Sequence, residues 1–103
     1  MAAEINTRDA GTLVLEGNVT SENVVALRSK GEGIICQMSS KGVIDLAGLA
    51  SANTITLSLL LSWLRFAKRS NVSLKINQPP SKLFDMARVS GLELILPFEM
   101  VEG

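Results

Sequence analysis

Several short runs of the chain alternate apolar and polar positions or are rich in β-favouring apolar residues, and both patterns are typical of β-strands. The clearest run is residues 72–76, Val-Ser-Leu-Lys-Ile, and a further β-favouring run ends before Gly17. These and weaker runs predict strands at residues 3–8, 12–16, 43–46, 72–76 and 94–96. Residues 9–11, Asp-Ala-Gly, contain turn-forming types and are expected to join the first two strands as a hairpin.

Apolar residues that recur three and four positions apart predict three helices, at residues 22–38, from a cap at Asn53 or Thr54 to residue 71, and at residues 81–90. Gly31 and Gly33 interrupt the first of these, and a glycine costs about 1 kcal/mol of helix propensity. We favour one continuous helix because Gly31 lies on its apolar stripe, where it would let the backbone approach a sheet. The alternative ends this helix at Gly31 and makes residues 34–38 a strand.

The middle helix is apolar on two sides, which exceeds what a surface helix needs. One stripe is Leu57, Leu60, Leu61 and Leu64, and the other is Ile55, Leu59, Trp63 and Phe66. Apolar residues at helical spacing are usually core, so neighbouring helices could cover both stripes. The second interpretation leaves the stripe that contains Trp63 partly exposed, as a docking surface for a partner protein.

The order of the predicted elements is typical of an α/β fold, because strands that alternate with helices form parallel crossovers in one sheet. We expect a mixed, mostly parallel sheet of four to five strands with three helices, and a hairpin at the start. A length of 103 residues corresponds to one domain, which we expect to span residues 1–103.

Composition then excludes several kinds of chemistry. The chain has no histidine and one cysteine, so it cannot form a zinc finger, a Ser–His–Asp triad or a Cys–x–x–Cys redox pair. Its net charge is zero, which gives no electrostatic basis for binding nucleic acid. Residues 57–66 fall short of a membrane span, and the start of the chain does not resemble a secretory signal. We therefore expect a cytoplasmic, non-catalytic protein that needs no cofactor or metal.

Residues 43–61 read VIDLAGLASANTITLSLLL and resemble the signature of the STAS domain family, which includes the anti-sigma-factor antagonists. That signature is a strand ending in Asp-Leu-Ser-Gly, a short loop, and an Asp-Ser/Thr-small-Gly-Leu segment that opens an apolar helix. Other segments agree in order, including Leu-Val-Leu-Glu-Gly near the start and Leu-Phe-Asp-Met-Ala before Gly91. The resemblance covers nearly the whole chain and implies the STAS fold.

Within this family the long first helix and the run Thr-Leu-Ser-Leu-Leu-Leu-Ser-Trp are most similar to the small cytoplasmic STAS subunit of Mla-type phospholipid ABC transporters of Gram-negative bacteria. The resemblance implies a non-catalytic subunit that binds the transporter's ATPase subunit and is peripheral to the inner membrane when in complex. The alternative is an anti-sigma-factor antagonist whose partner is an anti-sigma-factor kinase.

Thr54 falls at the position of the phosphorylatable Ser/Thr of the antagonists and of a functionally important Thr in the transporter subunits. A helix N-terminus favours an anion, so the fold would tolerate a phosphate there. The alternative is that Thr54 has no role in function and is an ordinary first-turn or N-cap residue of the helix. The chain departs from the family pattern, with Asn53 in place of Asp and the bulkier Ile55 and Thr56 after the hydroxyl residue. These changes disfavour phosphoregulation and favour a constitutive docking surface.

The resemblance and the two-sided helix together place the partner-binding surface at the start of the middle helix. The candidate contact residues are Asn53, Thr54, Thr56, Ser58 and Trp63, and Thr54 is the candidate phosphorylation site.

Overall fold

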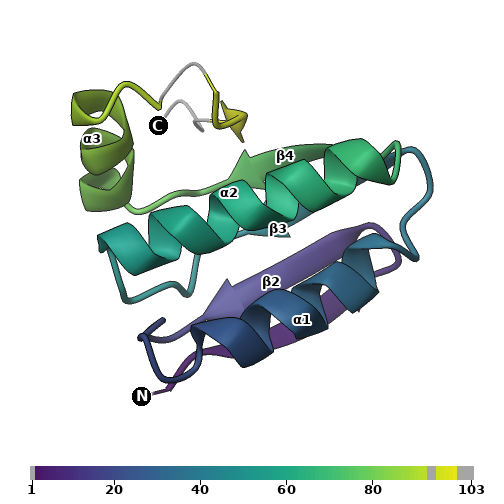
Figure 1. The fold of residues 1–103 in the computed structure, drawn as a ribbon, viewed down its shortest axis with the longest axis horizontal. Coiled ribbons are helices and arrows are strands. Elements are labelled where there is room, and N and C mark those ends of the chain that lie inside the picture. The colour runs from purple at the N-terminus through teal and green to yellow at the C-terminus, as the bar shows by residue number, and fades with distance from the viewer. Residues whose placement is uncertain (1, 93–94, 100–103) are drawn as a thin grey trace.

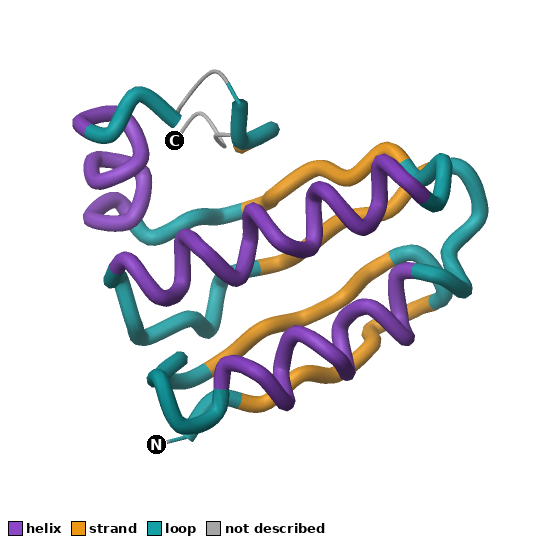
Figure 2. Tube along the Cα trace, viewed as in Figure 1, coloured by secondary structure: helices purple, strands orange, loops and turns teal. Residues whose placement is uncertain are grey.

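The computed structural model describes residues 2–92 and 95–99, which form three helices and five strands. In chain order these are β1 (Glu4–Asp9), β2 (Thr12–Glu16), α1 (Val24–Ile35), β3 (Lys41–Asp45), α2 (Thr54–Arg69), β4 (Ser73–Asn77), α3 (Ser81–Val89) and β5 (Phe98–Glu99). The order agrees with the predicted alternation of strands and helices (Figure 1; Figure 2).

The strands form one sheet in the order β1-β2-β3-β4-β5. β1 and β2 pair antiparallel, whereas β2, β3, β4 and β5 pair parallel along the sheet. The hairpin between β1 and β2 turns at Gly11, whose N–H donates to Asp9 Oδ1 over 2.9 Å. The predicted α/β fold, with a mixed and mostly parallel sheet and three helices, is confirmed.

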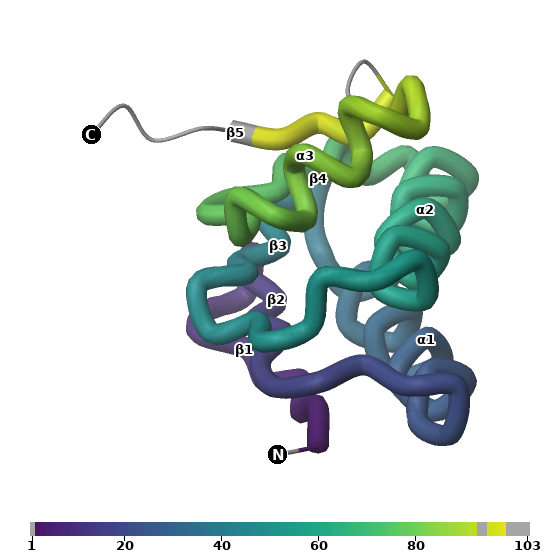
Figure 3. Tube along the Cα trace, turned by 90° about the vertical axis from the view of Figure 1, so that its left-hand side faces the viewer, coloured from purple at the N-terminus to yellow at the C-terminus, as the bar shows by residue number. Residues whose placement is uncertain are grey.

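The helices α1 and α2 lie side by side on one face of the sheet, and the core lies between them and the strands (Figure 1; Figure 3). Alternate strand positions supply the sheet side of this core, namely Ile5, Leu13, Leu15, Ile44, Leu74 and Ile76. The intervening positions, such as Asn6 and Lys75, are exposed. α3 lies apart from α1, beyond the carboxyl end of β4 (Figure 1).

The helix α1 continues through both glycines, so the favoured prediction is confirmed and a strand at residues 34–38 is wrong, although the helix is shorter than 22–38. A Cβ on Gly31 would lie 2.3 Å from the Trp63 ring of α2. The indole Nε1 also donates to the Arg28 carbonyl over 3.2 Å. Gly31 therefore serves close approach between two helices, rather than the approach to a sheet that we expected.

The last strand does not lie at residues 94–96, where the sequence predicted it. Leu94 lies outside the described residues, and Ile95 and Leu96 form a turn in which both N–H groups donate to the Leu92 carbonyl. Pairing with β4 starts one residue later, because the Pro97 carbonyl accepts from Ile76 N over 2.9 Å. A proline can accept at a strand's beginning although it has no N–H to donate. The residues of β5 then follow, and the Phe98 ring packs edge-on against Phe84 of α3 with centroids 5.6 Å apart.

Candidate partner-binding site at the start of α2

Asn53 fixes the first turn of α2 from both ends of its side chain. Its Oδ1 accepts from Thr56 N over 2.8 Å, which satisfies a backbone donor that the helix itself leaves open. Its Nδ2 donates to the Val19 carbonyl over 3.2 Å. The half-buried amide therefore caps α2 and also ties it to the loop that leads from β2 to α1.

Thr56 belongs to a buried chain of hydrogen bonds beneath this turn. Val19 N donates to Ser51 Oγ over 2.9 Å, and the hydroxyls of Ser51 and Thr56 are 3.0 Å apart. Thr56 Oγ1 donates to Asn53 Oδ1 over 3.0 Å, because an amide oxygen only accepts. The Ser51 hydroxyl must consequently donate to Thr56. The side chain of Thr56 is 0% exposed, so its prediction as a partner contact is wrong.

The prediction of Trp63 as a partner contact is also wrong, because its side chain is 0% exposed. Its ring fills the space over Gly31, and its neighbour on the same stripe, Leu59, is buried as well. The stripe thus packs against α1 through its central residues, with Ile55 and Phe66 half-buried at its ends. The core interpretation of the second stripe holds at Leu59 and Trp63.

Thr54 and Ser58 are exposed one turn apart, on the solvent side of α2. The Thr54 hydroxyl makes no hydrogen bond within the part of the chain that the structure describes, so it is available to a partner. Beside Ser58 lies a shallow groove of about 220 Å³ between α1 and α2, lined by Val24, Val25, Arg28, Ile55, Ser58, Leu59 and Ser62. The surface therefore combines hydroxyl groups, an apolar floor and one guanidinium.

The sequence did not predict that α1 contributes to this groove. Val25 is 64% exposed, and Arg28 lies one turn further along α1. An available signal was that Val25 is apolar but falls off the helical stripe of Val24, Leu27 and Gly31. An exposed apolar residue beside a groove is a feature of binding surfaces.

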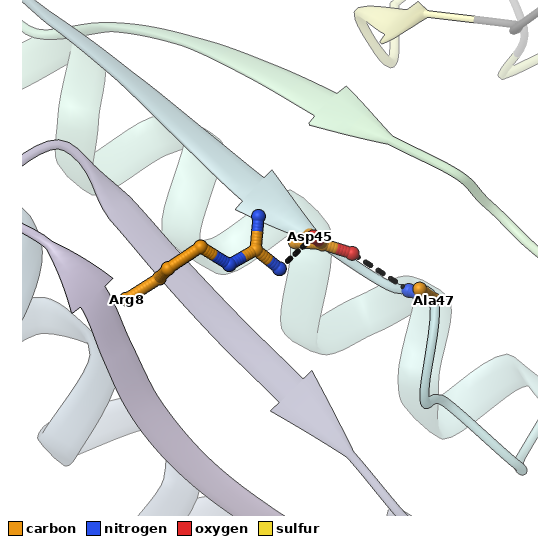
Figure 4. A network of polar contacts seen from close by, with 3 residues as sticks. All are labelled: Arg8, Asp45 and Ala47. Carbon is orange, nitrogen blue, oxygen red and sulfur yellow. Dashed lines mark hydrogen bonds and ion pairs between the residues drawn. The ribbon is translucent and has the colours of Figure 1, made fainter.

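The loop from β3 to α2 is held at its beginning by Asp45 at the end of β3. The Asp45 Oδ1 atom accepts from Ala47 N over 2.8 Å, and Oδ2 forms an ion pair with Arg8, which reaches across β2 from β1 (Figure 4). Burial by itself would raise the pKa of Asp45, but the Ala47 N–H and the Arg8 guanidinium outweigh it and hold the pKa below its ordinary value. Asp45 is therefore a positioning residue for the loop.

The same loop rests on the residues that follow β2. Gly17 N donates to the Gly48 carbonyl over 3.0 Å, and Ala50 N donates to the Gly17 carbonyl over 2.8 Å. Gly17 has φ +83°, and a Cβ there would lie 2.6 Å from the Ala2 carbonyl oxygen. Glycine is required at this crossing, which places the loop before α2 against the loop before α1.

Within residues 2–92 and 95–99, no group of three His, Cys, Asp or Glu side chains is arranged to hold a metal ion. No helix in this part of the chain is long and apolar enough to cross a membrane.

Residues 3–98 match the family model described as "Mlab, STAS domain". The chain belongs to the STAS domain family. No curated protein matches the sequence. In this STAS domain the turn at Asn53 and the exposed Thr54 occupy the segment that resembles the family signature. The Nδ2 bond to Val19 also gives a physical reason for Asn in place of the usual Asp, because a carboxylate could not donate to that carbonyl.

Solved structures of anti-sigma factor antagonists share the fold of this STAS domain. The unphosphorylated form of SpoIIAA is 16% identical, with a TM-score of 0.74 over 98% of this chain and 89% of that chain. The phosphorylated form of the Bacillus SpoIIAA is 16% identical, with a TM-score of 0.70 over 98% and 92%. An antagonist from Mycobacterium paratuberculosis is 13% identical, with a TM-score of 0.74 over 94% and 83%. At these identities the likeness establishes the STAS fold.

Proposed function

We propose that this STAS domain is a non-catalytic, cytoplasmic subunit of a phospholipid ABC transporter, and that it binds the ATPase subunit through the start of α2. In the complex it is peripheral to the inner membrane. The observation that carries the proposal is the exposure of Thr54 on a turn whose other polar groups are bonded internally. The family description "Mlab, STAS domain" supports the transporter branch.

The geometry supports docking because the surface is already ordered before a partner arrives. Asn53 is bonded to Thr56 and Val19, so the turn loses little conformational freedom on binding. Ser58 offers a hydroxyl group in the groove, Thr54 is exposed one turn before it on α2, and Arg28 offers a charge on the α1 wall. A partner can therefore combine apolar contact with directed hydrogen bonds over this surface.

Replacing Thr54 by Glu tests this proposal. The substitution adds a charge and bulk to the surface, while a carboxylate in the first turn suits the helix dipole and preserves the fold. We expect affinity for the ATPase subunit to fall by about tenfold or more, a typical loss when a charge enters an interface without a partner. Isothermal titration calorimetry with the purified ATPase subunit measures this change.

Ser81→Glu is the matched control, because Ser81 is the exposed first residue of α3 and receives the same type of charge at a helix start. It should bind the ATPase subunit like the wild type. Wild-type affinity of Thr54→Glu would contradict the proposal.

An anti-sigma-factor antagonist is the second candidate function, and the solved structures that share the fold favour it. In that case an anti-sigma-factor kinase is the partner and Thr54 is the phosphorylation site. Thr56 is buried, so Thr54 and Ser58 are the accessible hydroxyls on this turn and the next. Incubation with ATP and such a kinase, followed by mass spectrometry, distinguishes the two functions. Phosphate on Thr54 supports the antagonist, and an unmodified chain that binds the ATPase subunit supports the transporter subunit.

A further inference from the structure

A second groove lies along the other half of α2, away from Thr54. Leu61 and Leu64 of α2 form its floor, and Leu92, Ile95 and Pro97 form its wall. Its volume is about 390 Å³, larger than that of the groove beside Ser58. Both floor residues are half-buried, and Ile95 is 63% exposed. This stretch of the surface is apolar, and α1 does not cover it.

Two cations border the groove on α2. Arg65 and Lys68 are exposed and stand three residues apart, which places them on neighbouring turns of one helix face. Neither forms an ion pair with another residue that the structure describes, in contrast to Arg88, which pairs with Asp85 on α3. The groove therefore combines an apolar floor with two positive charges that have no counter-charge among the residues that the structure describes.

We propose that this groove binds a short, acidic amphipathic helix of a partner protein. Its apolar face would lie on Leu61 and Leu64, and carboxylates one turn apart would meet Arg65 and Lys68. Residues 54 and 68 are separated by about 21 Å along the helix axis, at 1.5 Å per residue. A short helix in this groove leaves Thr54 free, so the inference does not depend on the proposed function.

A second copy of this chain does not supply such a helix from its described residues. Glu32 is the one acidic residue of α1, α2 has none, and Asp85 is the one acidic residue of α3, where Arg88 pairs with it. An anionic membrane is disfavoured because the groove has two cations and the whole chain has a net charge of zero. A separate acidic protein segment fits the charges best.

The test uses the full chain, labelled with ¹⁵N, and a designed peptide of about four helical turns. The peptide carries leucines on one face and paired glutamates beside them, and its control has lysines in place of the glutamates. We expect the glutamate peptide to shift the resonances of Leu61, Leu64 and Ile95. The double variant Arg65→Glu/Lys68→Glu should weaken its binding by about tenfold or more and should gain binding of the lysine peptide.

A matched variant distinguishes binding at this groove from a general effect of the chain's positive charge. Lys30→Glu/Lys82→Glu removes two exposed cations elsewhere and should leave peptide affinity unchanged. Equal binding of both peptides, absence of binding, or shifts confined to other surfaces would overturn the proposal. Sedimentation of the chain with phosphatidylglycerol vesicles, abolished by Arg65→Glu/Lys68→Glu, would assign the groove to a membrane and also overturn it.

Discussion

The starts of α1 and α2 use the same residue type in two different ways. Asn23 precedes α1, and its Oδ1 accepts from Thr20 N, back towards the preceding loop, so it does not cap its own helix. Asn53 precedes α2, and its Oδ1 accepts from Thr56 N, forward into the helix. Position at a helix start therefore does not by itself make an asparagine a cap.

The two asparagines nevertheless converge on one stretch of backbone. Asn23 Nδ2 donates to the Asn18 carbonyl over 3.1 Å, and Asn53 Nδ2 donates to the Val19 carbonyl over 3.2 Å. The same loop thus orders both helix starts, but α2 gains a buried hydroxyl chain that α1 lacks. This difference explains why the start of α2 is the better candidate for a preformed binding surface.

The contact that holds the two helices together is expected to give the largest effect. Gly31→Ala places a Cβ 2.3 Å from the Trp63 ring, whose Nε1 is bonded to Arg28, so the helices must separate. We expect a loss of about 3 kcal/mol in the free energy of unfolding, typical of a severely overpacked core. Urea unfolding measures it.

Gly33→Ala on the same helix is the control for this substitution. A Cβ on Gly33 meets nothing within 4 Å, and alanine favours helix. A gain of about 0.5 kcal/mol is expected from propensity. Equal effects of the two substitutions would contradict the packing argument.

Replacing each asparagine by alanine compares the stability of the two helix starts directly. Asn53→Ala removes the cap and leaves the Val19 carbonyl and the Thr56 N–H without their partner, so we expect a loss of about 2 kcal/mol. Asn23→Ala breaks bonds in an exposed loop and should lose about 0.5 kcal/mol. Thermal and urea unfolding of both variants give the comparison. Similar losses would show that the starts are equivalent.

The substitution Asn53→Asp tests the contribution of the Nδ2 donor alone. Aspartate retains an oxygen that caps α2, but it cannot donate to the Val19 carbonyl. A loss of about 1 kcal/mol in unfolding free energy is expected, because one bond is removed and a carboxylate faces a carbonyl oxygen. If Asn53→Asp were as stable as the wild type, the bond to Val19 would not be the reason for asparagine here.

Lowering the pH is expected to have the smallest effect on the free energy of unfolding. The pKa of Asp45 is lowered in the folded state, so its contribution to stability is present above the ordinary pKa of about 3.9 and is lost as the pH falls below it. Asp45→Asn should therefore show a flatter dependence of unfolding free energy on pH between about 5 and 3. Asp9, whose pKa the Gly11 N–H also lowers, titrates in both proteins. Parallel pH profiles would contradict the role of Asp45.

Local chemistry made the start of α2 and the end of α3 predictable, but not the bounds of α1. A cap at Asn53 or Thr54 was expected from residue type and position, and Asn53 is the cap that is observed. Gly91, which directly follows the helix predicted at residues 81–90, adopts φ +74°, a conformation that glycine favours. Asp45 likewise bonds the turn that directly follows it, because Ala47 N donates to its Oδ1. Each case depends on a few neighbouring residues.

Burial was not predictable in the same way, because it depends on residues far apart in the chain. Trp63 is covered because Gly31 has no side chain, and Thr56 is covered beneath the turn, where its hydroxyl bonds to Ser51 and Ser51 in turn to Val19 N. The last strand was likewise misplaced at residues 94–96, because the pairing with β4 starts at the Pro97 carbonyl. The sequence identifies the segment that forms the candidate site, whereas the tertiary contacts determine which of its side chains reach the solvent.

The pairing of Gly31 with Trp63 also restricts how this chain can diverge. A larger residue at position 31 fits only if the side chain at position 63 shrinks, so the two positions should vary together among homologues. A change at either position alone should be rare, and lineages that lose the indole should be the ones in which alanine or serine replaces the glycine.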